Sequence, residues 1–241
     1  MKPLKFIQIF GILLLAGQIS CDFYLPVERI RGDGNVVTEE RDVPEFEGIK
    51  VSTGVDVYIT RGEHKTLEVE ADENIQEVLI TEVNNGILHV YCSKNVYRAK
   101  SLKVFASTET LNNIKISSAG DVECKGTFNA DRLDIGLSSA GNLFIDVEAN
   151  EIDCSISSSG DVDISGSADY LYARLSSAGD LNAYDLKVED CEISVSSAGS
   201  AKIYVTGDLK ARASSAGSIY YRGDPGRIDS RSSSAGGIHK R

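Results

Sequence analysis

Basic residues are few and scattered in this chain. Its 241 residues include 25 Lys and Arg against 36 Asp and Glu, which gives a formal net charge of −11. No cluster of Lys and Arg stands out to supply the basic patch that phosphate contacts require. The composition therefore argues against a nucleic-acid partner.

A long apolar run is also missing. The longest one, residues 6–16, follows Lys2 and Lys5 and is too short to span a membrane. A basic start, a short apolar run and then small polar residues are typical of a secretory signal. We predict a signal peptide over residues 1–20 and an exported protein.

The predicted signal ends at a cysteine. The stretch Gln18-Ile19-Ser20-Cys21 resembles a lipobox, although Gln18 stands where an aliphatic residue is usual. We predict Cys21 as the lipid-attachment residue, residues 21–35 as a tether, and a place in the cell envelope as an outer-membrane lipoprotein. An ordinary cleaved signal with an incidental cysteine is the alternative.

Groups that carry catalysis are scarce. The three histidines, His64, His89 and His239, have no plausible nucleophile beside them, and the serines form no Gly-x-Ser-x-Gly elbow. The sequence predicts no catalytic residues and no cofactor, and we expect a protein that is not an enzyme.

What the chain has in abundance is one tetrapeptide. Ser-Ser-Ala-Gly, or Ser-Ser-Ser-Gly in one copy, occurs seven times and ends at Gly120, Gly141, Gly160, Gly179, Gly199, Gly217 and Gly236. A period near 20 residues is typical of solenoids, in which each coil buries its apolar face against its neighbours.

The residues around each glycine alternate with a period of two. Before it stand triplets such as Leu133-Ile135-Leu137 and Ile152-Cys154-Ile156, and after it pairs such as Val162-Ile164. This spacing predicts two half-buried strands per coil that meet at a narrow corner, and it excludes a helical solenoid. At such a corner, Gly permits backbone angles closed to other residues and Ala adds little bulk.

These patterns predict an all-β chain. We expect a right-handed parallel β-helix of about 19 residues per coil over residues 111–241, since parallel connections are almost always right-handed. Residues 36–110 are predicted to be a β-rich part with hairpins, one of them at Asn84-Asn85-Gly86, and with a short helix within 72–79. Residues 51–57 resemble a degenerate corner.

Four further cysteines are Cys92, Cys124, Cys154 and Cys191. Cys124, Cys154 and Cys191 fall in inward columns of different coils, so disulfides between them are improbable. We expect buried free thiols that pack as small apolar residues.

Carboxylates recur on the outward side just after the corners. Residues in equivalent positions of successive coils lie about 4.8 Å apart, where a hard cation such as Ca²⁺ relieves the repulsion between stacked carboxylates. The candidate metal ligands are Asp121, Glu123, Asp161, Asp163 and Asp180. The alternative is that these residues favour turns and solvate the face.

The coils differ little in length, from 18 to 21 residues. Polysaccharide-cleaving β-helix enzymes build their clefts from long loops, and catalytic loops need length to converge on a substrate. This uniformity is the strongest sequence argument against catalysis.

The Ser-Ser-Ala-Gly series, the run "GVDVYITRGEHKTLEVEADENIQEVLITEVNNGILHVY" and the ending "YYRGDPGRIDSRSSSAGGIHKR" resemble the GIN-domain family of exported proteins of Bacteroidetes-type bacteria. The likeness extends over roughly residues 46–241. Members are described as auto-transporter adhesin heads, so the resemblance implies a β-helical fold, an envelope location and adhesion.

We therefore expect a non-enzymatic binding module with a rigid body for a polysaccharide or protein partner, attached to the membrane through its N-terminal lipid. The alternatives are a periplasm-facing scaffold lipoprotein and, less favoured, a carbohydrate-active β-helix enzyme. The last coil leaves a strand edge through which two copies could associate.

Overall fold

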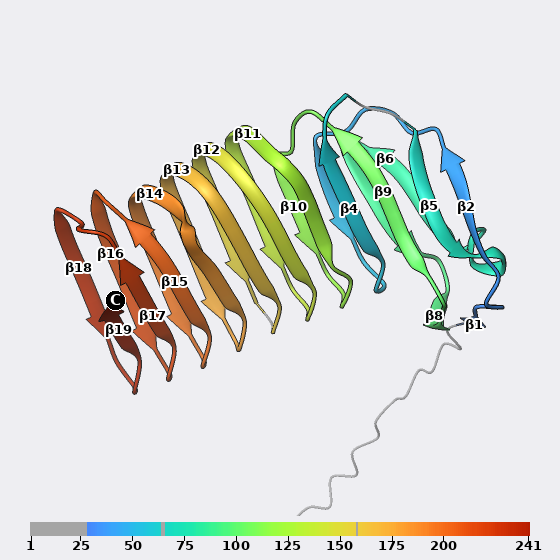
Figure 1. The fold of residues 1–241 in the computed structure, drawn as a ribbon. Coiled ribbons are helices and arrows are strands. Elements are labelled where there is room, and N and C mark those ends of the chain that lie inside the picture. Colours follow the sequence, from blue (N-terminus) through green and yellow to red (C-terminus); the bar gives the residue numbers. More distant parts are fainter. Residues whose placement is uncertain (1–27, 64–65, 158) are drawn as a thin grey trace, which may run out of the picture.

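The computed structural model describes residues 28–63, 66–157 and 159–241, and it shows one elongated β-helix with a cap of antiparallel strands at one end (Figure 1). Its C-terminal coil lies at the opposite end from the cap. The expected signal peptide and the lipid-attachment residue Cys21 lie outside the described residues. No helix in the described ranges is long and apolar enough to cross a membrane.

The strands before the first corner are short. They are β1 (Arg29–Arg31), β2 (Val36–Arg41), β3 (Gly48–Val51), β4 (Asp56–Arg61), β5 (Leu67–Asp72), β6 (Leu79–Asn84), β7 (Ile87–Cys92), β8 (Asn95–Arg98), β9 (Leu102–Thr108) and β10 (Asn113–Ile116). The first four of the later strands are longer because they continue around a bend, and the last five are short again. They are β11 (Val122–Leu137), β12 (Asn142–Ile156), β13 (Asp161–Ser176), β14 (Asp180–Ser196), β15 (Ser200–Val205), β16 (Asp208–Ser214), β17 (Ser218–Arg222), β18 (Arg227–Ser232) and β19 (Gly237–Lys240).

Successive coils pair in parallel and in the register that the glycine spacing predicts. Val122 pairs with Leu143, Leu143 with Val162, and Val162 with Leu181. These inward side chains are buried, as are the triplets before each corner, and together they form one continuous core along the axis. The predicted parallel β-helix of about 19 residues per coil is confirmed.

Each coil contributes to two sheets. The strands that enter the corners form the pre-corner sheet, and those that leave them form the post-corner sheet. The pre-corner sheet runs through β7, β3, β10, the second halves of β11–β14, β16 and β18. The post-corner sheet runs through β9, β4, the first halves of β11–β14, β15, β17 and β19.

The order of the first coils in space differs from their order in the sequence. β3 pairs with β7 on one side and with β10 on the other, so residues 48–61 form a coil inserted between residues 87–108 and the repeats. The predicted degenerate corner within residues 51–57 lies directly against the first repeated corner, where Ser117 donates its backbone N–H to the Val51 carbonyl at 3.0 Å. The β-helix therefore extends well into the part that was expected to be hairpins.

The corner glycines serve a different purpose from the expected one. None of Gly120, Gly141, Gly160, Gly199, Gly217 and Gly236 has a positive φ. Instead, a β-carbon on Gly160 would lie 2.6 Å from the carbonyl oxygens of Gly141 and Ser139. Glycine is required because the corners stack too closely for a side chain. The left-handed angles fall on the preceding residues of the later corners, such as Ser215 and Ala216 with φ of 52° and 66°.

The cap contains the predicted hairpin and corrects the predicted helix. β6 and β7 pair in antiparallel fashion around Asn85 and Gly86, whose φ values of 52° and 74° are those of a type I′ turn. The helix expected within residues 72–79 is only a 3₁₀ turn, η1 (Glu73–Ile75), and Asp72 makes no side-chain cap on it.

Asp72 holds the start of the described chain in place through hydrogen bonds. Its carboxylate accepts the backbone N–H groups of Gly34 at 2.8 Å and of Lys100 and Ser101 at 2.8 and 3.2 Å. Burial on its own raises the pKa of Asp72, but these three hydrogen bonds outweigh it and lower the pKa below its ordinary value. β1 also pairs with β8, so residues 29–31 of the tether predicted for residues 21–35 form a strand.

Candidate functional site

The predicted metal ligands all lie on the outward face of the post-corner sheet, but other residues separate them. Asn142 stands between Asp121 and Asp161, and its side-chain amide donates to Asp121 at 2.8 Å. Phe144 pairs with both Glu123 and Asp163. Asn142 and Phe144 thus separate Asp121 and Glu123 from the other three acidic groups.

Asp161 and Asp180 are the two candidates that meet in neighbouring coils. Asp163 instead accepts a hydrogen bond from the Asn182 amide at 3.0 Å. Within residues 28–63, 66–157 and 159–241, no group of three or more His, Cys, Asp or Glu is placed to hold a metal ion. The geometry therefore favours the reading in which these carboxylates solvate the face.

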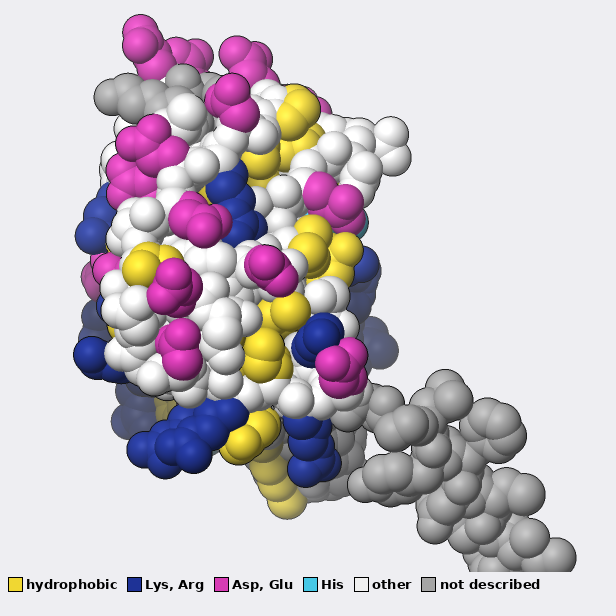
Figure 2. Space-filling model, turned by 90° about the vertical axis from the view of Figure 1, so that its right-hand side faces the viewer, with side chains coloured by type: hydrophobic (Ala, Val, Ile, Leu, Met, Phe, Trp, Pro, Cys, Tyr) yellow, Lys and Arg dark blue, Asp and Glu magenta, His cyan; other side chains and the backbone are white. Residues whose placement is uncertain are grey.

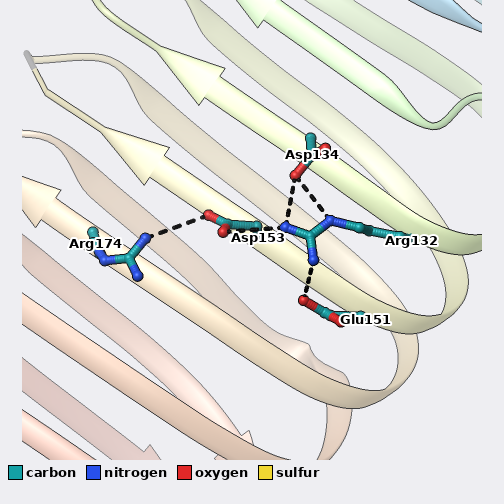
Figure 3. A network of polar contacts seen from close by, with 5 residues as sticks. All are labelled: Arg132, Asp134, Glu151, Asp153 and Arg174. Atoms are coloured by element: carbon teal, nitrogen blue, oxygen red, sulfur yellow. Dashed lines mark hydrogen bonds and ion pairs between the residues drawn. The ribbon is translucent and has the colours of Figure 1, made fainter.

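Charged residues form a connected network on the outward face of the pre-corner sheet (Figure 3). Arg132 donates to Asp134 in its own coil at 3.2 Å, and to Glu151 and Asp153 in the next coil, the latter at 3.5 Å. Arg174, one coil further, lies 3.8 Å from Asp153. One guanidinium thus offsets carboxylates from two coils, which would otherwise repel each other across the sheet.

A hollow of about 440 Å³ lies further along the same face. It extends over four successive coils, because Tyr170, Asp190, Asp208 and Arg227 occupy equivalent positions in β13, β14, β16 and β18. Each of these residues stands nine positions before a corner glycine. Lys210 and Asp229 complete its polar lining.

Ion pairs fix the charged groups of this hollow. Arg227 Nη2 lies 2.6 Å from Asp208 Oδ2, and Lys210 Nζ lies 2.7 Å from Glu192 Oε1. Asp190 accepts the backbone N–H of Asp208 at 2.7 Å. Carboxylates and cations therefore lie side by side in the hollow and are held in place before any ligand arrives.

An aromatic pair closes one end of the hollow. The rings of Tyr170 and Tyr172 lie 4.5 Å apart and are tilted by 38°. Burial, followed by hydrogen bonding to Tyr172, raises the pKa of the Tyr170 phenol. Tyr170 is therefore a neutral hydroxyl on a half-buried ring at neutral pH.

Sequence reasoning missed this hollow although its signal was present. Reading nine residues back from each corner glycine gives Arg132, Glu151, Tyr170, Asp190, Asp208 and Arg227. Two further columns lie beside this one: a largely acidic column seven residues before the glycine, as at Asp134, and a more basic column five residues before it, as at Arg174. The parallel register brings all three columns to one surface.

A larger hollow of about 590 Å³ lies near the cap. The charged residues that line it are Glu45, Glu47, Glu63 and Glu109, and its lining within the described part of the chain includes no Lys, Arg or His. Figure 2 looks onto this end of the molecule, where Asp and Glu spread over the upper part and Lys and Arg gather toward the lower part. A set of like charges without a donor offers a neutral ligand little directional binding, so we favour the hollow at Tyr170.

Cys124, Cys154 and Cys191 are buried free thiols, as predicted, and Cys92 is a fourth. Burial raises the pKa of both Cys124 and Cys154 to about 12, and it also raises that of Cys191. A thiol with so high a pKa is a poor nucleophile. These side chains contribute packing rather than reactivity.

The fold and surface define a parallel β-helix with short bends and charged outward faces. The family model described as "Putative auto-transporter adhesin, head GIN domain" matches residues 45–225. The chain belongs to this family, and the resemblance seen in the repeated corners is confirmed.

Solved structures share the fold. A putative adhesin from Bacteroides fragilis NCTC 9343 is 24% identical, with a TM-score of 0.79 over 88% of this chain and 100% of that one. A putative adhesin and a putative lipid binding protein, both from Parabacteroides distasonis ATCC 8503, are 24% and 23% identical, with TM-scores of 0.74 and 0.73. Each covers 89% of this chain and 100% of its own. A comparison with curated proteins gives no match.

Proposed function

We propose that this protein is an exported, membrane-anchored binding protein that holds a polysaccharide in the hollow beside Tyr170. The observation that carries the proposal is the geometry of that hollow: it follows the axis over four coils and presents one aromatic ring together with carboxylates and cations. The membership of the adhesin-head family supports a binding role.

The lining suits a polymer of sugars. Sugar hydroxyls both donate and accept hydrogen bonds, so they match the carboxylates of Asp190 and Asp229 as acceptors and Lys210 and Arg227 as donors. The half-buried ring of Tyr170 supplies a flat apolar surface for the C–H face of a sugar. Because the coils are about 4.8 Å apart, equivalent side chains form a ladder along which an extended chain can lie.

The charged lining is poorly suited to an acyl chain. One relative is described as a lipid binding protein, and a lipid tail needs a predominantly apolar pocket. The apolar groups that line this hollow are Cys191 and Leu209, both of which are buried in the core. A sugar is therefore the better fit for this chain, and an extended peptide is the second candidate.

A binding role agrees with the short connections around the hollow. The segments between the described strands β13, β14, β16 and β18 are corners and short bends. Catalysis would require a group that is free to move a proton, whereas Asp208 and Asp229 are each paired with an arginine at 2.6 and 2.7 Å. These ion pairs favour holding a ligand over transforming it.

Membrane attachment completes the proposal. A lipid on Cys21 would place the anchor on the N-terminal side of β1, which lies at the cap end of the β-helix (Figure 1). The C-terminal coils, including the hollow, would then point away from the membrane. A periplasm-facing scaffold remains the second candidate for the location.

A glycan array with the purified protein tests the binding role. We expect several related glycans to bind, with loss of signal for Tyr170→Ala and an unchanged signal for Tyr97→Ala, which removes a ring that is 60% exposed in β8. Bound glycans should be recovered at their original length. An array without signal, or shortened products, would refute the proposal.

A second experiment addresses the location. Protease is added to intact cells, and the fate of the protein is followed by immunoblotting. Cleavage in intact cells supports display on the surface, whereas protection until the outer membrane is permeabilised supports the periplasmic scaffold.

A further inference from the structure

Charge is distributed unevenly along this acidic chain. Residues 200–241 contain eight Lys and Arg against three Asp, a net charge of +5, whereas residues 1–199 contain 17 basic and 33 acidic residues, a net charge of −16. The last coils, at the end opposite the cap, therefore form a basic end on an acidic body (Figure 1). The basic residues of this end are separated from one another in the sequence, so they do not stand out there as a cluster.

Most of these cations are neutralised by carboxylates. The ion pairs are Lys210–Glu192, Arg212–Asp229, Arg227–Asp208, Arg231–Asp229 and Lys240–Asp224. The remaining three, Lys202, Arg222 and Arg241, have no ion pair with any described residue. All three are exposed, and they belong to three successive coils.

The unpaired cations share the outward face of the post-corner sheet with aromatic rings. Lys202 pairs in register with Tyr220, and Tyr220 pairs with His239. Arg222 Cζ lies 3.9 Å from the ring centre of Tyr184, and Arg241 Cζ lies 5.0 Å from that of Tyr220. We call Lys202, Arg222, Arg241 and these rings the cationic face.

Stacking on a ring leaves a guanidinium free to bind anions. The ring occupies one flat side of Arg222, while the five N–H groups lie around its edge. Neither Arg222 nor Arg241 donates a side-chain hydrogen bond to another residue in the described part of the chain. The rings thus orient the charges without neutralising them.

We infer that the cationic face binds an acidic polysaccharide that carries carboxylates along its length. The three cations lie in neighbouring coils that are about 4.8 Å apart: Arg222 and Arg241 share one column, and Lys202 stands two positions earlier on its strand. Uncompensated charge that recurs from coil to coil suits a repeating anion rather than a single one. The inference shares with the proposed function a polysaccharide as ligand, but it uses the opposite sheet and a different recognition chemistry.

The surface argues against other polyanions. Tyr220 already stacks against His239 at 5.4 Å, and Tyr184 is covered by Arg222, so these rings are not free to stack on nucleic-acid bases. An anionic membrane calls for exposed apolar side chains beside the charges. The large exposed hydrophobics of the described residues are Tyr97, Phe144 and Ile228, and none belongs to the cationic face.

Affinity electrophoresis with polygalacturonate tests the inference, and the same polymer with its carboxylates methyl-esterified is the neutral control. We expect the wild type to bind the free acid at least about tenfold more tightly than the ester, a difference of about 1.4 kcal/mol. Lys202→Gln/Arg222→Gln should lose that advantage. The matched control Arg174→Gln/Arg231→Gln removes the same charge from the pre-corner face and should keep it.

Each other outcome contradicts the inference. Equal binding of acid and ester, or undiminished binding by Lys202→Gln/Arg222→Gln, would remove the cationic face as the site. Equally tight binding to single-stranded oligothymidylate or to phosphatidylglycerol vesicles, lost in that same variant, would show a general polyanion surface. If the inference about the cationic face fails, the proposed function still holds provided that neutral glycans bind and that Tyr170→Ala abolishes this binding.

Discussion

The carbonyl oxygen of Gly141 lies 2.6 Å from the point that a β-carbon on Gly160 would occupy. Neighbouring corners are therefore in backbone contact, and the coil spacing depends on the missing side chain. The same close approach holds at Gly217, where a β-carbon would lie 2.8 Å from the Val195 carbonyl oxygen.

Gly160→Ala should destabilise the fold by about 2–3 kcal/mol, because the added methyl group meets backbone that cannot move without separating two coils. Gly62→Ala is the matched control, since Gly62 has an ordinary φ and open space around it. Urea unfolding followed by circular dichroism measures both. Equal midpoints for the two variants would contradict the stacked-corner account.

Alkaline pH should destabilise the protein through its buried thiols. The folded-state pKa of Cys124 and Cys154 is about 12, raised by burial above the value of 9 for a free thiol. Their stabilising effect is therefore complete below pH 9 and is lost as the pH rises toward 12. At pH 10 each thiol should lower the free energy of unfolding by about 1.4 kcal/mol relative to its value at neutral pH.

The variant Cys124→Ala/Cys154→Ala isolates this effect. It should be less stable at pH 7 because it leaves small cavities, but its free energy of unfolding should fall less steeply between pH 8 and pH 10. Identical pH slopes in the variant and the wild type would show that these thiols do not titrate on unfolding.

The network around Arg132 should contribute modestly and in a salt-dependent way. Arg132→Met leaves Asp134, Glu151 and Asp153 without their shared cation, and we expect a small loss of stability at low salt. Arg174→Met removes one contact of 3.8 Å and should change stability less. The difference between the two variants should shrink in 1 M NaCl, and a difference that persists there would point to packing instead.

Calcium removal should leave the melting temperature unchanged. Asn142 and Phe144 separate the acidic residues after the corners, so no compact group of ligands is available to a cation in the described chain. A ligand at one hundred times its dissociation constant adds about 2.7 kcal/mol to stability. A melting temperature that falls by several degrees with a chelator and recovers with Ca²⁺ would establish a metal site after all.

The sequence was sufficient to predict the coils because their register is local and regular. The inward columns, from Val122 to Ile219, follow from counting residues around each glycine, and the structure keeps that register. The inserted coil at β3 and β4 was not predictable in this way, because its neighbours are chosen by contacts between segments far apart in the chain. The narrowness of the corners was predictable from the stacking of coils, but the backbone angles expected at the corner glycines were wrong.

The two candidate binding surfaces were missed for a related reason. Tyr170 and Arg227 are distant in sequence and come together only through three successive coil pairings. Whether Lys202 and Arg222 have ion-pair partners depends on which carboxylates lie near them in the folded chain. The alternation of apolar and polar residues along the sequence does not show this. The net charge of the whole chain is negative, and this average does not show that its C-terminal end is basic.

The central claim is that the hollow beside Tyr170 holds a polysaccharide. Its most direct test is affinity electrophoresis of the wild type, Tyr170→Ala and Tyr97→Ala through gels that contain mannan, xylan or dextran. The account predicts that at least one neutral polymer retards the wild type and Tyr97→Ala alike, and that Tyr170→Ala migrates as it does in a gel without polymer. Equal retardation of all three proteins, or none in any gel, would contradict it.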